Sequence, residues 1–167
     1  MKYFLYLTLP LYFLDQLTKG LVVKYIEFTT PTNPGVYVTP FFNLTHVHNK
    51  GVAFGMANGT PWANIVFGLV SLTALIVIVV LARKGAFVGR IAKCAAALLC
   101  AGILGNLTDR IHYGAVIDFL DFHWGDKHFA NFNIADSCIC IAAGLIFITA
   151  FLPEPEEAEG DVEEESA

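Results

Sequence analysis

The sequence predicts an all-α polytopic membrane protein, with four transmembrane helices and a small extracytoplasmic β-sheet between the first two helices. Two observations predict this fold class. Apolar residues make up 56% of the chain and charged residues only 15%, with a mean hydropathy of +0.60, whereas soluble domains carry about 25% charged residues. In addition, four mainly apolar stretches approach or reach the roughly 20 residues that a helix needs to cross a bilayer. We therefore expect one membrane domain over residues 1–153.

The four predicted spans differ in how many polar residues they contain. Their expected limits are residues 3–25, 62–81, 91–110 and 134–152. The first contains Pro10, which we expect to break the helix, because proline lacks a backbone N–H and clashes with the preceding turn. It also contains Asp15 and Lys19, which interrupt its apolar core and argue against a cleaved signal peptide. The second contains no charged residue and is the clearest span.

The loop between the second and third spans predicts the orientation of the chain. Four basic residues lie close together there: Arg83, Lys84, Arg90 and Lys93. Basic loops stay on the cytoplasmic side of a membrane. We therefore expect both termini in the cytoplasm and the connections 26–61 and 110–133 outside it.

Two further segments have distinct compositions. The connection 26–61 contains GVYVTPFFNLTHVHN, which is rich in β-branched and aromatic residues and bounded by turn residues, so it predicts β-strands. Residues 154–167 hold most of the chain's acidic residues and almost no apolar ones. Such a composition is typical of a disordered, solvated tail.

Polar residues gather where the third predicted span ends. Helical spacing places Gly102, Asn106, Asp109 and Arg110 along one side of that helix. Gly102 allows a neighbouring backbone to come close. Asp109 and Arg110 are expected to pair with each other or with groups on neighbouring helices, so a structural clamp is one interpretation of this cluster.

Asp118 and Asp136 are the candidate catalytic residues. Asp118 follows the third span in an apolar run, and Asp136 lies in the first turn of the fourth span, so both fall at the same membrane level. Asn133 and Asp136 also have the spacing of a capping box, so a purely structural role is the alternative. Two carboxylates in a water-poor cleft share one proton. The ionised one can then activate water while the protonated one binds a carbonyl, which hydrolyses an amide without metal or cofactor.

The remaining ionisable residues carry weaker signals. Asp15 and Lys19 lie four residues apart, a spacing that favours an ion pair facing other helices, with a snorkelling lysine as the alternative. The five histidines all fall in the outer connections, and no zinc-binding motif is present. The four cysteines lie in apolar stretches without a CxxC pair and are typical of packing residues. We therefore expect no metal or cofactor.

Five short blocks occur in order along the chain: DQLTK (15–19), NKGVAFG (49–55), GNLTDR (105–110), VIDF (116–119) and FNIAD (132–136). Together they resemble lipoprotein signal peptidases, also called signal peptidase II. The resemblance implies a four-helix fold with an extracytoplasmic β-cradle in the bacterial inner membrane. It implies cleavage of prolipoproteins just before a diacylglyceryl-modified cysteine. It further implies membrane lipid as a partner; we expect a monomer and no nucleic-acid partner.

The resemblance also implies roles for individual residues. It assigns the catalytic pair to Asp118 and Asp136. It assigns substrate contacts to Asn49, Asn106, Arg110 and Asn133. It assigns support of the site to Asp15, Lys19, Gly51, Ala53 and Asp109. Two positions depart from the family pattern, because Ala101 replaces a frequent glycine and His48 replaces a frequent arginine.

Two other classes of protein are compatible with parts of the sequence. A small transporter could use Asp118 and Asp136 as proton relays, although such proteins place ionisable groups nearer the membrane midplane. A non-catalytic assembly protein could use the same aspartates only as caps and clamps.

Overall fold

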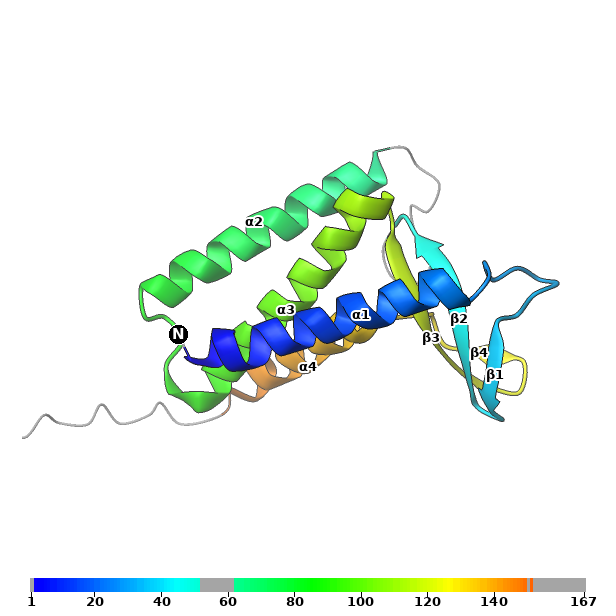
Figure 1. Ribbon diagram of the computed structural model, residues 1–167. Helices are drawn as coiled ribbons and strands as arrows, with labels where there is room; N and C mark the ends of the chain where they lie inside the picture. The colour runs from blue at the N-terminus through cyan, green and yellow to red at the C-terminus, as the bar shows by residue number, and fades with distance from the viewer. Residues whose placement is uncertain (1, 52–61, 150, 152–167) are drawn as a thin grey trace, which may run out of the picture.

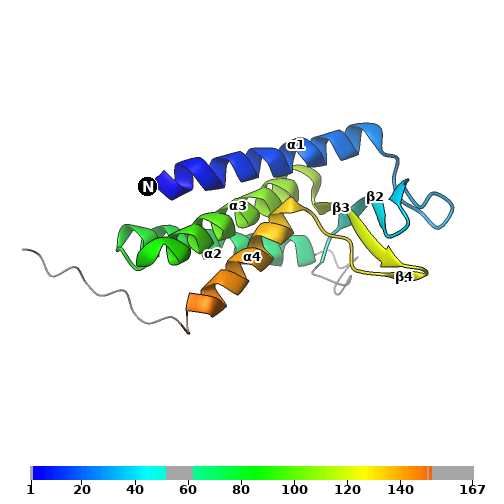
Figure 2. The ribbon, with the colours of Figure 1, turned by 90° about the horizontal axis from the view of Figure 1, so that it is seen from below.

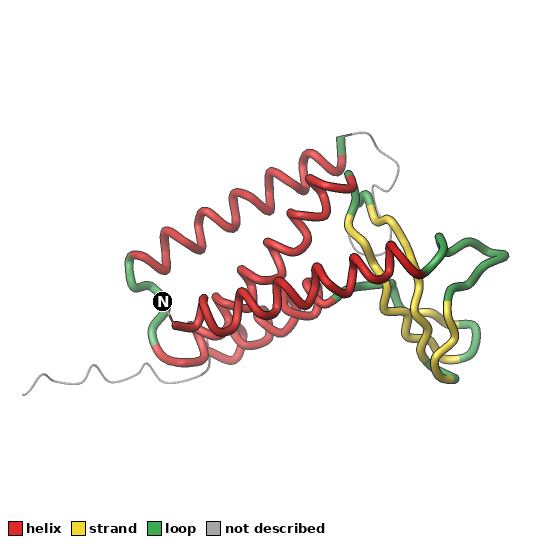
Figure 3. Tube along the Cα trace, viewed as in Figure 1, coloured by secondary structure: helices red, strands yellow, loops and turns green. Residues whose placement is uncertain are grey.

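A computed structural model describes residues 2–51, 62–149 and 151, and it shows a bundle of helices with a β-sheet at one end (Figure 1). The helices are α1 (Leu9–Tyr25), α2 (Ala63–Arg83), α3 (Gly89–Tyr113) and α4 (Ile134–Thr149), with a π-helical segment η1 (Phe4–Thr8) before α1. The strands are β1 (Val36–Thr39), β2 (Phe42–Asn49), β3 (Val116–Trp124) and β4 (Lys127–His128). Helices and strands therefore occupy separate ends of the molecule (Figure 3).

The sheet draws strands from both predicted outer connections. Its order is β1-β2-β3-β4, and every neighbouring pair is antiparallel. The prediction that the sheet lies wholly within residues 26–61 is therefore wrong, because β3 and β4 come from the connection after α3. β3 is buried on both faces over Val116–Phe119, so its sequence lacks the alternating pattern by which a half-exposed strand is detected.

α3 is the central helix of the bundle, and it packs against η1, α1, α2 and α4 (Figure 2). Small residues let α4 approach closely. A Cβ atom added at Gly102 would meet the Ala135 carbonyl oxygen and would lie 2.6 Å from Cγ1 of Ile139. The predicted role of Gly102 as a point of close backbone approach is thus confirmed.

Two helix boundaries differ from the predictions. Pro10 does not break the first helix, because residues 2–25 are helical without interruption and Pro10 lies in the first turn of α1, directly after η1. A wider π-helical turn accommodates the missing N–H of the proline. α3 continues past residue 110 to Tyr113 and ends at Gly114, which has the left-handed conformation (φ 68°) that favours glycine. The polar cluster consequently lies before the end of α3 rather than at its end.

The outer surface of the bundle is strongly apolar. Among the described residues, α2 and α3 are long and apolar enough to cross a membrane, and α4 is a shorter apolar helix. On α2, Ile65, Leu69 and Val70 are all more than half exposed. Exposed apolar surface of this extent is typical of helices that contact lipid.

Candidate active site

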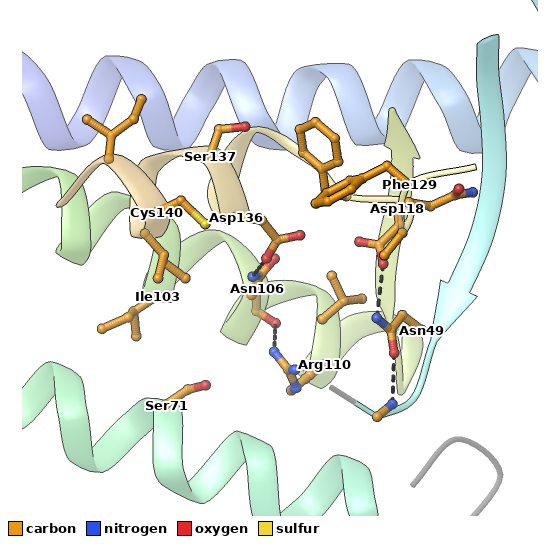
Figure 4. A pocket seen from close by; sticks show the side chains of 17 residues that line it. Asn49, Ser71, Ile103, Asn106, Arg110, Asp118, Phe129, Asp136, Ser137 and Cys140 are labelled. Carbon is orange, nitrogen blue, oxygen red and sulfur yellow. Dashed lines mark hydrogen bonds between the residues drawn. The ribbon is translucent and has the colours of Figure 1, made fainter. Parts of the chain in front are cut away.

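Asp118 and Asp136 line one cavity of about 690 Å³ between α2, α3, α4 and the sheet (Figure 4). β3 carries Asp118, whose side chain is almost fully buried at 2% exposure. The first turn of α4 carries Asp136, which is half-buried. The fold thus brings the two aspartates to the same end of the bundle, as the sequence predicts.

Asp136 makes the capping-box contacts and one further contact. Its backbone N–H donates to Oδ1 of Asn133 at 2.8 Å, and its Oδ2 accepts from the Asn133 backbone N–H at 3.2 Å. Its Oδ1 accepts from Nδ2 of Asn106 at 2.7 Å. A cap does not need a partner on a second helix, so the Asn106 contact points beyond a purely structural role.

Two amides hold the carboxylate of Asp118. Asn133 Nδ2 donates to Oδ1 at 2.8 Å, and Asn49 Nδ2 donates to Oδ2 at 3.0 Å. Burial, and next the negative charge of Asp136, raise the pKa of Asp118 to about 7, against the opposing effect of the two amide donors. Near neutral pH, Asp118 is therefore able to hold a proton.

Asp15, Lys19 and Asp109 form a buried ion triad behind the aspartates. Lys19 Nζ lies 2.8 Å from Asp15 Oδ2 and 2.8 Å from Asp109 Oδ2. The predicted Asp15–Lys19 pair is confirmed, and the snorkelling alternative is wrong because the lysine side chain is only 2% exposed. Gln16, for which the sequence indicated no role, donates to Asp109 Oδ1 at 3.0 Å.

Arg110 lines the cavity without pairing with Asp109. Its Nη1 donates to the backbone carbonyl of Asn106 at 3.3 Å, and its guanidinium lies 6.0 Å from the centre of the Phe67 ring. Asp109 instead faces Lys19, because adjacent residues on a helix point in different directions. Gly51 donates its N–H to Oδ1 of Asn49 at 3.0 Å, whereas Ala53 lies outside the described residues.

The histidines of β2 form a hydrogen-bonded pair. Nε2 of His46 lies 3.2 Å from Nε2 of His48, and Nδ1 of His46 lies 2.8 Å from the Ile26 carbonyl oxygen. Burial, followed by the charges of His46 and Lys50, lowers the pKa of His48. His48 therefore does not replace the positive charge of the arginine that is frequent at this position. Across residues 2–51, 62–149 and 151, no group of three His, Cys, Asp or Glu side chains is arranged to hold a metal ion.

Several cavity residues were not predicted from the sequence. They are Ser71, Phe129, Asn131, Ser137 and Cys140, together with apolar residues of α3 and α4. Ser71 lies in the middle of α2, so the cavity extends from the sheet down the bundle (Figure 4). Ser71, Ser137 and Cys140 lie on apolar helices, which give no sequence signal for which of their sides lines a cavity, and Phe129 and Asn131 lie in the loop between β4 and α4.

A pair of aspartates at the end of an apolar helix bundle, one buried and one half-buried and both held by amides, is the arrangement of a membrane aspartic hydrolase. The sequence profile described as Signal peptidase (SPase) II matches residues 7–152. This chain belongs to the signal peptidase II family, whose members are aspartic peptidases.

Similar proteins agree with this assignment. The lipoprotein signal peptidase of Aeromonas hydrophila is 39% identical over 92% of this chain and 90% of its own length. That of Yersinia enterocolitica is 42% identical over 73% of each chain. A solved structure described as a bacterial membrane enzyme has a TM-score of 0.78 and 30% identity, and the match covers 94% of this chain and 95% of the solved one.

Proposed function

We propose that Asp118 and Asp136 are the catalytic pair with which this signal peptidase II removes the signal peptide from prolipoproteins, just before the diacylglyceryl-modified cysteine. The observation that carries this proposal is the shared cavity, in which Asp118 is almost fully buried and able to hold a proton near pH 7, whereas Asp136 is half-buried and lies in the first turn of α4. Unequal environments of two carboxylates identify the acid and the base of such a pair.

In the proposed reaction, Asp136 is the base and Asp118 is the acid. Asp136 takes a proton from water, the hydroxyl adds to the carbonyl carbon, and Asp118 donates its proton to the carbonyl oxygen. When the tetrahedral intermediate collapses, the oxygen returns that proton to Asp118 and the C–N bond breaks. Asp136 then gives its proton to the leaving amine, which restores both aspartates. No metal or cofactor takes part in these steps.

The walls of the cavity suit a substrate that is part lipid and part peptide. We assign substrate contacts to Asn49, Asn106, Arg110 and Asn133, three of which line the cavity directly. Arg110 brings a positive charge and hydrogen-bond donors to the side that faces α2. Ile103, Ile139 and Ile141, which also line the cavity, offer an apolar wall for the signal peptide.

The proposed topology has four spans in the bacterial inner membrane, with both termini in the cytoplasm and the sheet outside. The apolar exposed faces of α2 and α4 support it, as does the basic loop after α2. Residues 1–153 form the membrane domain, a monomer in contact with lipid, and residues 154–167 form an acidic cytoplasmic tail. The lipid anchor of the substrate then holds the scissile bond at the depth of Asp118 and Asp136.

Cleavage by purified protein tests this function. The substrate is a synthetic prolipoprotein segment with a diacylglyceryl cysteine, and the control is the same peptide with a free cysteine. Mass spectrometry should show a cut directly before the modified cysteine and little cleavage of the control. Cutting at another bond, or equal cutting of both peptides, would contradict the proposed specificity.

A matched pair of variants tests the catalytic assignment. Asp118→Asn should lose cleavage, whereas Asp121→Asn, three residues further along β3, should keep it. Asp121 is also buried, but its carboxylate binds Asn43 and His128 and does not line the cavity.

A further inference from the structure

The buried ion triad of Asp15, Lys19 and Asp109 is connected to both catalytic aspartates through the backbone. Oδ1 of Asp15 accepts the N–H of Ala135 at 2.8 Å, and Ala135 directly precedes Asp136. Oδ2 of Asp109 accepts the N–H of Ile117 at 3.1 Å, and Ile117 directly precedes Asp118. One carboxylate of the triad thus holds the chain next to each member of the pair.

The lysine of the triad also contacts a side chain of the active site. Lys19 Nζ donates to Oδ1 of Asn106 at 3.1 Å, in addition to its two carboxylate contacts. An ammonium group has three N–H donors and no acceptor, so these three contacts use its full capacity. Its charge is balanced locally by two carboxylates, which weakens its direct effect on more distant groups.

The Lys19 contact determines which way the Asn106 amide faces. An amide has an oxygen on one side and an NH₂ group on the other, and their positions follow from the hydrogen-bond partners. Because Lys19 only donates, the oxygen must face Lys19 and the NH₂ group must face Asp136. The reverse orientation would place N–H against ammonium and oxygen against carboxylate, so it is disfavoured on both sides.

The fixed amide in turn determines what Asp136 can do. Its Oδ1 receives the Asn106 NH₂ group at 2.7 Å, and its Oδ2 receives the Asn133 backbone N–H at 3.2 Å. Neither donor can accept a proton in return. Both oxygens of Asp136 are therefore acceptors, and hydrogen bonds of this kind favour the charged carboxylate. Asp118 also accepts two amide N–H donors, but it is almost fully buried, and the effect of burial on its pKa outweighs that of the donors.

We propose that Asp15, Lys19 and Asp109 form a positioning unit that places both catalytic aspartates and, through the Asn106 amide, keeps Asp136 as the carboxylate that activates water. The three residues are positioning residues, because they touch neither substrate nor the reacting water. This inference rests on the proposed function, and it adds the reason why Asp136, and not Asp118, is the base. Other charged groups around Asp136 are Asp118 on β3 and Arg110 on α3.

Two variants test the inference. Asn106→Leu removes the amide and leaves the ion triad paired. A triple variant, Asp15→Asn with Lys19→Met and Asp109→Asn, removes the lysine without leaving a buried charge, and its asparagine oxygens can still accept the N–H groups of Ala135 and Ile117. The measurement is kcat/KM for the lipidated peptide between pH 5 and pH 9.

Each variant should move the acid side of the pH profile upward by about one pH unit, so that activity at pH values well below its midpoint falls roughly tenfold more than activity at the optimum. Combining both sets of changes should add no further shift, since they act through the same amide. A merely structural role would lower the rate by one factor at every pH, and that result would overturn the inference. If the triple variant fails to fold, Asn106→Leu alone decides.

The Asp118→Asn variant separates this inference from the proposed function. Full activity of Asp118→Asn would contradict the proposed function itself. An inactive Asp118→Asn together with an unshifted Asn106→Leu profile would contradict only the positioning inference. Where turnover is too slow for a pH profile, infrared spectroscopy can follow the protonation of the Asp136 carboxyl. This carboxyl should stay protonated to a higher pH in Asn106→Leu than in the unmodified chain. Loss of the proton at the same pH in both proteins would overturn the inference.

Discussion

At the scale of single residues, the site depends on different surroundings for two like side chains. Asp118 is almost fully buried, while Asp136 lies in the first turn of α4, where the helix dipole favours a negative charge. The sequence already placed Asp118 in an apolar run and Asp136 at the start of a helix. It also predicted the Asp15–Lys19 pair from the four-residue spacing. It could not choose the partner of Asp109, because that depends on how α1 packs against α3.

The raised pKa of Asp118 leads to a prediction about pH. Asp118 must be protonated to act as the acid, so cleavage should fall as the pH rises through about 7. A carboxyl group whose pKa is raised in the folded state keeps its proton there while the unfolded state loses it, so the stability of the folded state falls as the pH rises from the unfolded pKa to the folded one. The melting temperature of Asp118→Asn, relative to the unmodified chain, should therefore increase between pH 5 and pH 8. Constant activity up to pH 9, with no change in relative melting temperature, would contradict the protonated role of Asp118.

At the scale of elements, the helices were predictable and half of the sheet was not. Long apolar runs identify spans of the bundle from composition alone. β3 was missed because both of its faces are covered, so its residues read only as an apolar run outside a helix. The close contact of α3 with α4 was signalled by Gly102, since only a residue without a side chain fits against the Ala135 carbonyl.

Gly102→Ala should weaken the packing of α3 against α4. The added methyl group would overlap the Ala135 carbonyl oxygen and Ile139, and overpacking of this kind costs about 1–3 kcal/mol. Gly144→Ala is the matched control, because a Cβ atom at Gly144 in α4 meets nothing within 4 Å. Thermal melting in detergent should show a lower melting temperature for Gly102→Ala and little change for Gly144→Ala. Equal melting temperatures would show that α3 and α4 move apart to accept the methyl group without a loss of stability, and would contradict this prediction.

At the scale of the whole molecule, the site lies at the end of the bundle where α3 ends and α4 begins, next to the sheet (Figure 1). That location favours a hydrolase over a transporter, whose relay groups lie near the midplane. The cavity could not be predicted from the sequence, because it depends on the separation of α2 from α4.

The proposed topology predicts the side of the membrane on which each loop lies. A reporter fused at Gly85, after α2, should report a cytoplasmic location. A reporter fused at Gly125, in the turn between β3 and β4, should report a location outside the cytoplasm. The basic residues around Gly85 provide the reason. A cytoplasmic signal at Gly125 would place the active site on the wrong side for its substrate.

The most direct test of the catalytic pair is a cleavage time course for Asp136→Asn, measured alongside thermal melting. Loss of a cap costs about 0.5–2 kcal/mol of stability and leaves the chemistry intact, whereas loss of a general base costs about 10²–10⁴-fold in rate. We predict a folded variant without detectable cleavage of the lipidated peptide. Near-normal turnover with a melting temperature only a few degrees lower would show that Asp136 merely caps α4, and would contradict the catalytic pair.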